Sequence, residues 1–287
     1  MNPAFSFIIL TYNEEQHLPR LLHSISGLYA PLFILDSGST DGTLKIAADF
    51  GATVKYNSFE NHPKQWDFAL KNFDIKTPWI IGLDADQIVT PELFEQLLNF
   101  KDENYQNVNG IYFNRKNFFK GKWIRYGGYY PKYLLKMFRK DVGFSDTNEN
   151  MDHRFVVQGN TIIWKKGHIL EENLKENEIS FWINKHNRYS DLVADEEIER
   201  MQSLRIQTIR PNLFGDPYQR MAFLKKLWWK LPRGLRPFIY FGYRMSFQLG
   251  FLDGRTGILF HFLQGFWFRL IVDVKIAEKL KNRSSYE

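Results

Sequence analysis

Residues 79–86 read Trp-Ile-Ile-Gly-Leu-Asp-Ala-Asp, an apolar run that ends in two aspartates separated by one alanine. A buried strand presents acids at its tip in this way, and the alternation of an extended chain predicts that Asp84 and Asp86 lie on the same side. Two carboxylates so placed supply hard oxygen ligands for a divalent cation that faces a diphosphate. The alternative is an acidic loop before the next helix, because residues 90–92, Thr-Pro-Glu, are a good helix start.

Apolar runs alternate with amphipathic stretches from residue 5 to residue 100. We expect strands at residues 5–10, 32–35, 53–56 and 79–83, and helices at residues 14–26, 43–50, 63–73 and 91–100. This order predicts an α/β fold in which a mostly parallel sheet has helices on both faces. Ligands of such sheets bind beyond the carboxyl ends of the strands, where residues 11–13, 36 and 84–86 fall.

The pattern changes after residue 109. Residues 111–113 and 155–157 are predicted strands, and residues 178–199 are predicted to form one long helix that carries His186. A basic and aromatic segment begins at Pro211. We therefore expect an α/β domain at residues 1–210 and a helical segment at residues 211–287.

The net charge of +6 is concentrated near the C-terminus, where residues 210–269 contain ten Lys or Arg and two Asp. This asymmetry indicates an anionic partner. Bulky Phe and Trp residues in long apolar company, with Lys and Arg at the margins, favour an anionic membrane surface over nucleic acid. A helical subdomain or a dimer surface that covers its own aromatic residues is the third interpretation.

Composition also bears on location. The 287 residues include no Cys, which excludes disulfides and thiol chemistry and agrees with a reducing compartment. We see no secretory signal, and no uninterrupted apolar run is long enough to span a bilayer. We expect a cytoplasmic protein that is peripheral on the inner face of the cytoplasmic membrane. The seven His show no paired ligand spacing, so no zinc site is expected.

Two polar segments follow the first two predicted strands. In residues 11–14, Thr-Tyr-Asn-Glu, Tyr12 could stack on a base that Thr11 and Asn13 hydrogen-bond, or the segment could cap the next helix. In residues 36–42, Asp-Ser-Gly-Ser-Thr-Asp-Gly, Asp36 could accept from a ribose hydroxyl or a base imide, or the segment could be a tight turn. The second segment lacks the spacing of a dinucleotide or P-loop site.

Three segments, in this order, resemble glycosyltransferase family 2. They are residues 11–14, residues 35–43 (Leu-Asp-Ser-Gly-Ser-Thr-Asp-Gly-Thr) and residues 82–86 (Gly-Leu-Asp-Ala-Asp). Five further motifs resemble the bacterial branch of this family that builds lipopolysaccharide core and exopolysaccharide. They lie at residues 122–131, 151–154, 185–190, 250–254 and 263–268. The resemblance implies transfer that inverts the anomeric centre. It also implies the GT-A fold, a Rossmann-like nucleotide-binding sheet with a mixed acceptor-side extension.

The resemblance assigns roles to particular residues. Asp36 matches the carboxylate that reads the base, usually uracil, and Asp84 would contact the ribose or the donor sugar. Asp86 matches the acid that ligates Mg²⁺ or Mn²⁺ on the diphosphate. The positions that match donor-binding residues are Thr11, Tyr12, Asn13, Glu14, Asp36, Lys64, Gln65 and Asp84.

An inverting transfer needs a base that removes the proton of the acceptor hydroxyl. Relatives often read His-Glu-Arg where residues 152–154 of this chain read Asp-His-Arg. We favour Asp152 as the catalytic base over Glu149, with Asp146 and His153 as alternatives. The segment could instead be a polar loop held by an ion pair to Arg154.

We therefore expect an inverting hexosyltransferase. It would move a sugar from a nucleotide-sugar donor, a UDP-sugar by the resemblance, to a glycan or lipid-linked acceptor in cell-envelope polysaccharide biosynthesis. A sugar nucleotidyltransferase shares the sheet pattern, but it would need a Gly-rich basic loop after the first strand, which residues 11–14 do not provide. A catalytically degenerate protein of the same fold that acts as a membrane-associated scaffold is the non-enzymatic alternative.

Overall fold

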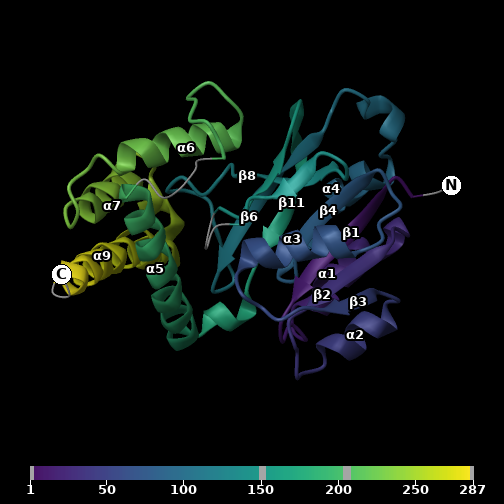
Figure 1. Cartoon of the computed structure of the whole chain (residues 1–287), viewed down its shortest axis with the longest axis horizontal. Coiled ribbons are helices and arrows are strands. Elements are labelled where there is room, and N and C mark those ends of the chain that lie inside the picture. The colour runs from purple at the N-terminus through teal and green to yellow at the C-terminus, as the bar shows by residue number, and fades with distance from the viewer. Residues whose placement is uncertain (1–2, 149–152, 203–207, 285–287) are drawn as a thin grey trace. The chain divides into compact units, whose positions relative to one another are not determined.

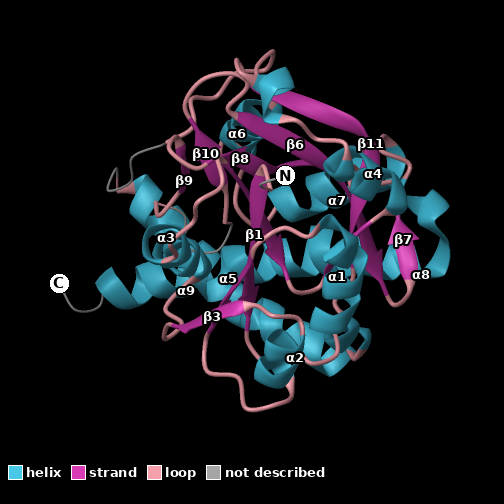
Figure 2. Cartoon of the chain, turned by 90° about the vertical axis from the view of Figure 1, so that its right-hand side faces the viewer, coloured by secondary structure: helices cyan, strands magenta, loops and turns pink. Residues whose placement is uncertain are grey.

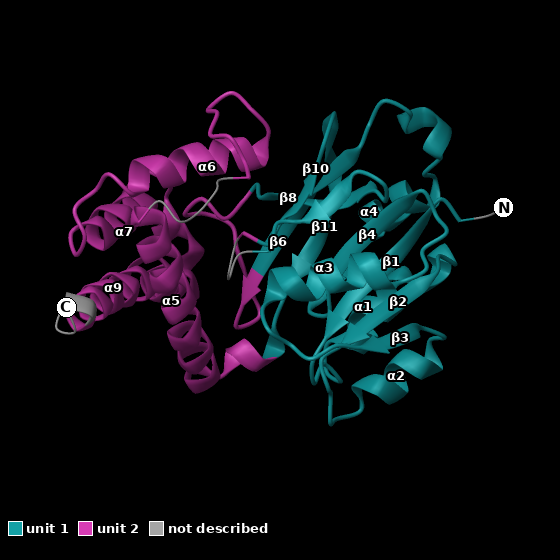
Figure 3. Ribbon diagram, viewed as in Figure 1, with its two compact units in different colours: residues 1–117, 131–147, 152–174 teal, residues 118–130, 148–151, 175–287 magenta. Residues whose placement is uncertain are grey.

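The computed structural model describes residues 3–148, 153–202 and 208–284 (Figures 1 and 2). The chain forms two compact units (Figure 3). Unit 1 contains residues 1–117, 131–147 and 152–174, and unit 2 contains residues 118–130, 148–151 and 175–287. The boundary predicted at residue 210 falls inside unit 2, and the membrane-interfacial role of residues 211–287 stays a prediction.

The first half of unit 1 alternates strands with helices, as the sequence predicts. The elements are β1 (Phe5–Thr11), α1 (Leu18–Ile25), β2 (Leu32–Asp36), α2 (Thr43–Asp49), β3 (Thr53–Tyr56), α3 (His62–Asn72), β4 (Trp79–Asp84) and α4 (Pro91–Leu98). Helix α1 begins four residues later than predicted. The amides of Asn13 and Glu14, where the predicted helix would start, instead donate to the side chains of Ser39 in the loop after β2 and of Thr43 at the start of α2.

The main sheet of the described residues has the strand order β3-β2-β1-β4-β8-β6-β11-β5. Strands β3, β2, β1 and β4 are parallel. Strand β8 (Tyr133–Arg139) runs antiparallel to β4 and to β6 (Gly110–Phe119), which pairs in parallel with β11 (Thr161–Glu171). Strand β5 (Gln87–Val89) is antiparallel to β11. Strand β7 (Lys122–Ile124) also pairs with β6, and β9 (Gly143–Ser145) forms a separate antiparallel pair with β10 (Phe155–Val157).

The strand register brings the ends of three strands together. Thr11 pairs with Asp36, and Leu10 pairs with Asp84. Because β1, β2 and β4 are parallel, their carboxyl ends meet at one edge of the sheet. The predicted donor-site residues that follow these strands therefore lie at the same edge.

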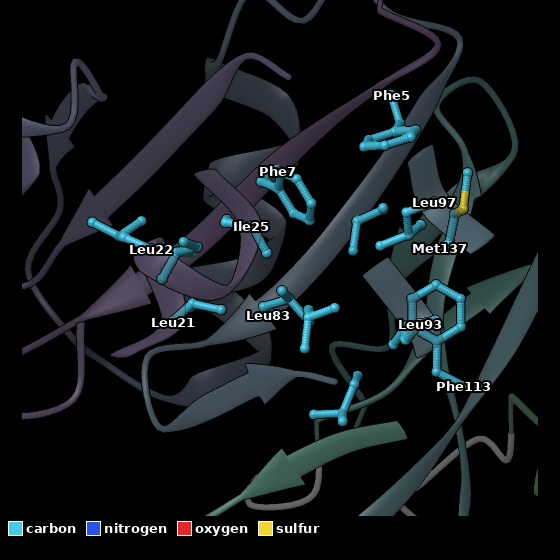
Figure 4. Packing of buried hydrophobic residues seen from close by; sticks show 14 of the residues in the cluster. Phe5, Phe7, Leu21, Leu22, Ile25, Leu83, Leu93, Leu97, Phe113 and Met137 are labelled. Atoms are coloured by element: carbon cyan, nitrogen blue, oxygen red, sulfur yellow. The ribbon is translucent and has the colours of Figure 1, made fainter. Parts of the chain in front are cut away.

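Both faces of the sheet are covered by helices, as predicted. Helices α1 and α4 pack leucines such as Leu22 and Leu93 against Phe7 and Leu83 on one face (Figure 4). On the other face, Trp66 of α3 meets the Phe155 ring. Gly82 makes room for this ring, because a Cβ atom there would lie 2.4 Å from Phe155. Burial on both sides explains why most residues of β1 and β4 are apolar.

Unit 2 is mostly helical. Its longer helices are α5 (Ile179–Met201), α6 (Pro217–Trp228), α7 (Arg236–Ser246), α8 (Gly254–His261) and α9 (Phe268–Ser284), with the shorter η4 (Gly250–Asp253) and η5 (Phe262–Trp267) around α8. Helices α5 and α9 share an apolar core that includes Ile198 and Val272. Arg236 of α7 pairs with Asp273 of α9 and, at 2.7 Å, with Glu197 of α5, all three being buried.

One helical run in the described part of the chain, Gly250–Asn282, has the length and mean hydropathy (1.3) to cross a membrane. Inside unit 2, 44% of its apolar window is buried. The run contains Asp273, whose ion pair with Arg236 is also buried. The run therefore contributes side chains to the core of unit 2 and leaves others, such as Phe251 and Leu259, exposed.

Candidate functional site

The loop after β2 is organised around the carboxylate of Asp36. Its Oδ1 accepts from the amides of Gly38 and Ser39 at 2.8 and 2.7 Å, and its Oδ2 accepts from the hydroxyls of Thr11 and Ser39 at 2.8 and 2.5 Å. A carboxylate has about four lone-pair sites. Asp36 therefore lies where the base-binding carboxylate is predicted, but its four hydrogen bonds are made within the protein and stabilise the loop after β2.

The segment after β1 is tied to the same loop. Asn13 has a left-handed backbone, with φ of 54°, and its Oδ1 accepts from the amide of Thr40 at 2.8 Å. Its own amide donates to Ser39 Oγ at 2.8 Å. The Tyr12 side chain is 57% exposed, as a platform for stacking on a base requires.

Glu14 has a structural contact of its own. The Nδ1 atom of buried His17 lies 2.5 Å from Glu14 Oε2, and His17 Nε2 is the acceptor for the amide of Leu174 at 2.8 Å. Since Nε2 accepts a hydrogen bond, the proton of a neutral imidazole is on Nδ1 and is donated to Glu14. The predicted donor residue Glu14 thus orients a histidine that holds the segment after β11 beside the start of α1.

Strand β4 ends at Asp84, and Ala85 and Asp86 form a turn before β5. The strand alternation predicted through Asp86 therefore stops at Asp84. The chain turns because β5 pairs antiparallel with β11 and does not continue β4. As a result, the two carboxylates have different partners.

Asp84 lies among nitrogen donors. Lys136 Nζ on β8 is 2.9 Å and Gln87 Nε2 is 3.0 Å from Asp84 Oδ2, while His62 Nε2 is 3.2 Å from Oδ1. Burial acts to raise the pKa of the Asp84 carboxyl, but the Lys136 ammonium and His62 outweigh it and hold that pKa well below its usual value. Asp84 is thus an ionised acceptor at neutral pH.

Asp86 has neutral contacts from the segment after β11. Its Oδ2 accepts from Asn173 Nδ2 at 3.2 Å, and its backbone carbonyl accepts from the amide of Glu172 at 3.1 Å. The Asp86 side chain is half-buried. Its carboxylate lies at the sheet edge that also holds Asp84.

A divalent cation can be tested against these two carboxylates. In the described ranges, no group of three or more acidic or His residues has the arrangement of a metal site. Mg²⁺ commonly takes only one or two protein carboxylates and completes its shell with phosphates and water. Asp86 fits such a site as a single protein ligand. Asp84 fits it less well, because a Lys136 ammonium already occupies one of its oxygens.

Several residues at this edge were missed by the sequence analysis. Gln87 Nε2 links Asp84 to Glu171 Oε2, at 2.8 Å, and Glu171 Oε1 accepts from Arg115 at 2.6 Å. Lys136 had a signal, because it is a lone cation among the apolar residues 134–138. His62 and Glu171 had none, since their position depends on pairings between distant strands.

Lys64 and Gln65 have different environments on α3. Gln65 is buried, and its amide bonds Ser37 Oγ at 2.9 Å and the backbone carbonyl of Asn57 at 3.1 Å, so it supports the loop after β2. Lys64 is half exposed and pairs with Glu60. Lys64 is therefore on the surface of α3 in this structure, and its donor-binding role stays a prediction.

The favoured bases, Asp152 and Glu149, lie outside the described residues. Of the alternatives, Asp146 is buried at the end of β9, and its amide bonds the Arg154 carbonyl at 3.0 Å. The His153 ring stacks on Trp66 with centroids 5.2 Å apart. Burial lowers the pKa of His153 well below its usual value, and the neighbouring His62 adds to the effect. His153 is therefore neutral at pH 7.

The predicted long helix, α5, places His186 in the interior of unit 2. The His186 ring stacks on Trp182, with centroids 3.6 Å apart, and its Nδ1 lies 2.9 Å from the Trp182 carbonyl. It also meets the Phe268 ring of α9 edge-on. His186 therefore packs within unit 2.

The chain is similar to known glycosyltransferases. Residues 6–159 match Glycosyl transferase family 2. The chain is 27% identical over 276 residues to the lipopolysaccharide core biosynthesis glycosyltransferase LpsC of Rhizobium meliloti, covering 91% of this chain and 90% of that protein. An uncharacterized glycosyltransferase of Rickettsia bellii is 32% identical over 97 residues, which cover 34% of this chain and 32% of that one.

A solved structure is also similar. That structure is TarS residues 1–349 of S. aureus in complex with UDP, with a TM-score of 0.44 and 14% identity over 99% of this chain and 92% of that one. The mixed α/β sheet of unit 1 has the GT-A fold class that the sequence predicted. Because the family match covers more than half of its residues, the chain belongs to glycosyltransferase family 2.

Proposed function

We propose that this protein transfers a sugar, with inversion, from a UDP-sugar to a glycan or lipid-linked acceptor in cell-envelope polysaccharide biosynthesis. The family supports sugar transfer, and similarity to LpsC over nine tenths of both chains supports the pathway. The observation that carries the proposal is that the register of β1 with β2 and β4 brings Asp36 and Asp84 to one sheet edge, with Asp86 in the turn that follows Asp84.

The nucleoside binds at the loop after β2 in this proposal. The exposed Tyr12 ring stacks on the uracil. Asp36 accepts the imide N–H once the Ser39 hydroxyl gives up its bond to Oδ2, since the two amide bonds to Oδ1 can remain. The loop thus exchanges one internal hydrogen bond for one to the base.

The diphosphate and sugar bind at the turn after β4. Asp86 would hold Mg²⁺ or Mn²⁺, which when bound offsets the negative charge of the departing diphosphate. Asp84, kept ionised by Lys136, accepts a hydroxyl of the ribose or donor sugar. The Lys136 ammonium adds positive charge beside the leaving group.

Inversion requires a base on the face of the sugar opposite the leaving diphosphate. We retain Asp152 for this role, with Glu149 as the alternative. The base takes the proton of the acceptor hydroxyl as the acceptor oxygen bonds to the anomeric carbon and the bond to the diphosphate breaks. Loss of transfer with intact UDP binding in Asp152→Ala, but not in Glu149→Ala, would identify Asp152.

Calorimetric titration of UDP, GDP, CDP and dTDP, each with and without Mn²⁺, tests the proposal. We expect UDP to bind, and to bind more tightly with Mn²⁺, because the diphosphate and Asp86 share the metal. Preference for another nucleotide would overturn the UDP assignment. Binding of none of the four would count against the donor site as a whole.

A further inference from the structure

Helix α7 of unit 2 exposes one apolar face. Phe238, Ile239 and Tyr243 are exposed along the helix, whereas Arg236 and Arg244 are buried. Directly after the helix, Phe247 is 82% exposed. The Phe247 ring stacks on that of Tyr243, with centroids 5.9 Å apart, and leaves most of its surface to solvent.

A second apolar face follows on η4 and α8. Its exposed side chains are Phe251, Leu252, Ile258, Leu259 and Phe262. The two faces join through Phe241 of α7, whose ring centroid lies 6.1 Å from that of Phe262. An apolar hollow at this junction is lined by Phe241, Phe262, Ile258, Leu259 and the single cation Arg255. The apolar side chains therefore form one patch, the α7–α8 face, larger than the scattered single residues of an ordinary surface.

The exposed charges of the chain segment that contains this face have one sign. Between residues 210 and 262 the exposed charged residues are all basic: Arg210, Arg220, Lys226, Lys230, Arg233 and Arg255. The two acids of this segment serve internal contacts. Asp216 caps α6 by accepting from the Tyr218 and Gln219 amides, and Asp253 is buried and accepts from the Arg125 and Tyr126 amides.

We propose that the α7–α8 face binds the anionic surface of a lipid bilayer, with Phe247, Phe251 and Leu252 inserted at the interface. Apolar side chains that enter the headgroup region and cations that meet anionic lipids act together in such binding. A second copy of this chain fits the face less well, because the exposed cations of residues 210–262 would meet like charges. The proposal concerns unit 2 alone and does not depend on the identity of the donor.

Vesicle flotation tests the proposal on the full chain. We expect the protein to float with vesicles that contain phosphatidylglycerol, and much less with pure phosphatidylcholine vesicles. Phe247→Ser/Phe251→Ser/Leu252→Ser should lower partitioning about a hundredfold or more, since three exposed apolar side chains no longer enter the interface. The matched control is Phe59→Ser, which removes a ring that is 56% exposed in unit 1 and should change nothing.

Two further measurements separate the alternatives. Lys226→Glu/Lys230→Glu/Arg233→Glu should abolish the preference for anionic vesicles, while thermal unfolding and UDP binding stay as in the wild type. No flotation of the wild type, or equal flotation of the wild type and the Phe247 triple variant, would overturn the proposal. It would also be overturned if sedimentation showed a dimer that the triple variant dissociates and neither protein floated, because a second copy would then be the occupant.

Discussion

The loop after β2 and the turn after β4 flank the same strand, β1, yet their carboxylates are held in opposite ways. Asp36 accepts only from neutral amides and hydroxyls of nearby loops. Asp84 lies beside the Lys136 ammonium and the His62 ring. The first arrangement suits recognition of hydrogen-bonding groups on a nucleoside. The second brings positive charge and N–H donors to the edge and suits a diphosphate.

The largest effect is expected from Asp86→Asn, which tests whether the turn after β4 binds the diphosphate through a metal ion. The substitution keeps the size of the side chain but removes the charge that a divalent cation needs. We expect sugar transfer to fall about a thousandfold or more, because the metal contributes several kcal/mol to leaving-group stabilisation. Calorimetry should show that Mn²⁺ no longer strengthens UDP binding.

The control for this variant is Asp74→Asn, which changes an aspartate that is 80% exposed and pairs with Lys76 on the surface of unit 1. It should leave both measurements unchanged. If Asp86→Asn retained the full Mn²⁺ dependence of UDP binding, the assignment of the metal to Asp86 would be wrong.

Lys136→Met tests how much the buried ammonium beside Asp84 contributes to the free energy of unfolding. The Lys136 side chain is 6% exposed, so its loss leaves the Asp84 carboxylate without its main partner. Breaking a buried pair costs about 3–5 kcal/mol, and we expect about 2–3 kcal/mol here because Asp84 keeps some contact with water. Urea unfolding at pH 7 measures this loss. Lys76→Met, at a surface pair, should cost less than about 0.5 kcal/mol.

The pH dependence of stability tests whether Lys136 lowers the pKa of Asp84. The pKa of Asp84 is lowered in the folded protein, so between the folded and unfolded pKa values the unfolded chain binds more protons. The stability that Asp84 contributes is therefore complete above about pH 4, the ordinary pKa of Asp, and is lost as the pH falls through the folded value. We expect urea unfolding of Lys136→Met to show a shallower decline over this acidic window. Parallel curves for the two proteins would show that Lys136 does not set the Asp84 pKa.

The loop after β2 and the turn after β4 also differ in how much of their structure the sequence predicts. The Asp36 loop is local, since Thr11, Asn13 and Ser39 belong to two short segments next to adjacent strands, and turn chemistry and strand order place them together. The Asp84 site is assembled from β4, β8, β5 and α3. Nothing in the sequence near Asp84 specifies that β8 enters the sheet beside β4 and delivers Lys136. The predicted strand alternation ends before Ala85 for the same reason, because β5 pairs with a distant strand, β11.

Tyr12→Ala is expected to have the smallest effect. It should weaken binding of the nucleoside at the loop after β2 without changing binding of the diphosphate at the turn after β4. The Tyr12 ring is exposed, so its removal should leave the fold unchanged. Stacking of one base on an aromatic ring contributes about 1–3 kcal/mol, and a ring open to solvent on one side belongs near the lower end. UDP affinity should therefore fall about tenfold, whereas the affinity for inorganic pyrophosphate with Mn²⁺ should stay the same, because pyrophosphate has no base. Tyr12→Phe should bind UDP like the wild type, since it keeps the ring. An equal loss of affinity for UDP and pyrophosphate in Tyr12→Ala would show that Tyr12 acts on the phosphate side, and the division between a nucleoside-binding loop and a diphosphate-binding turn would not hold.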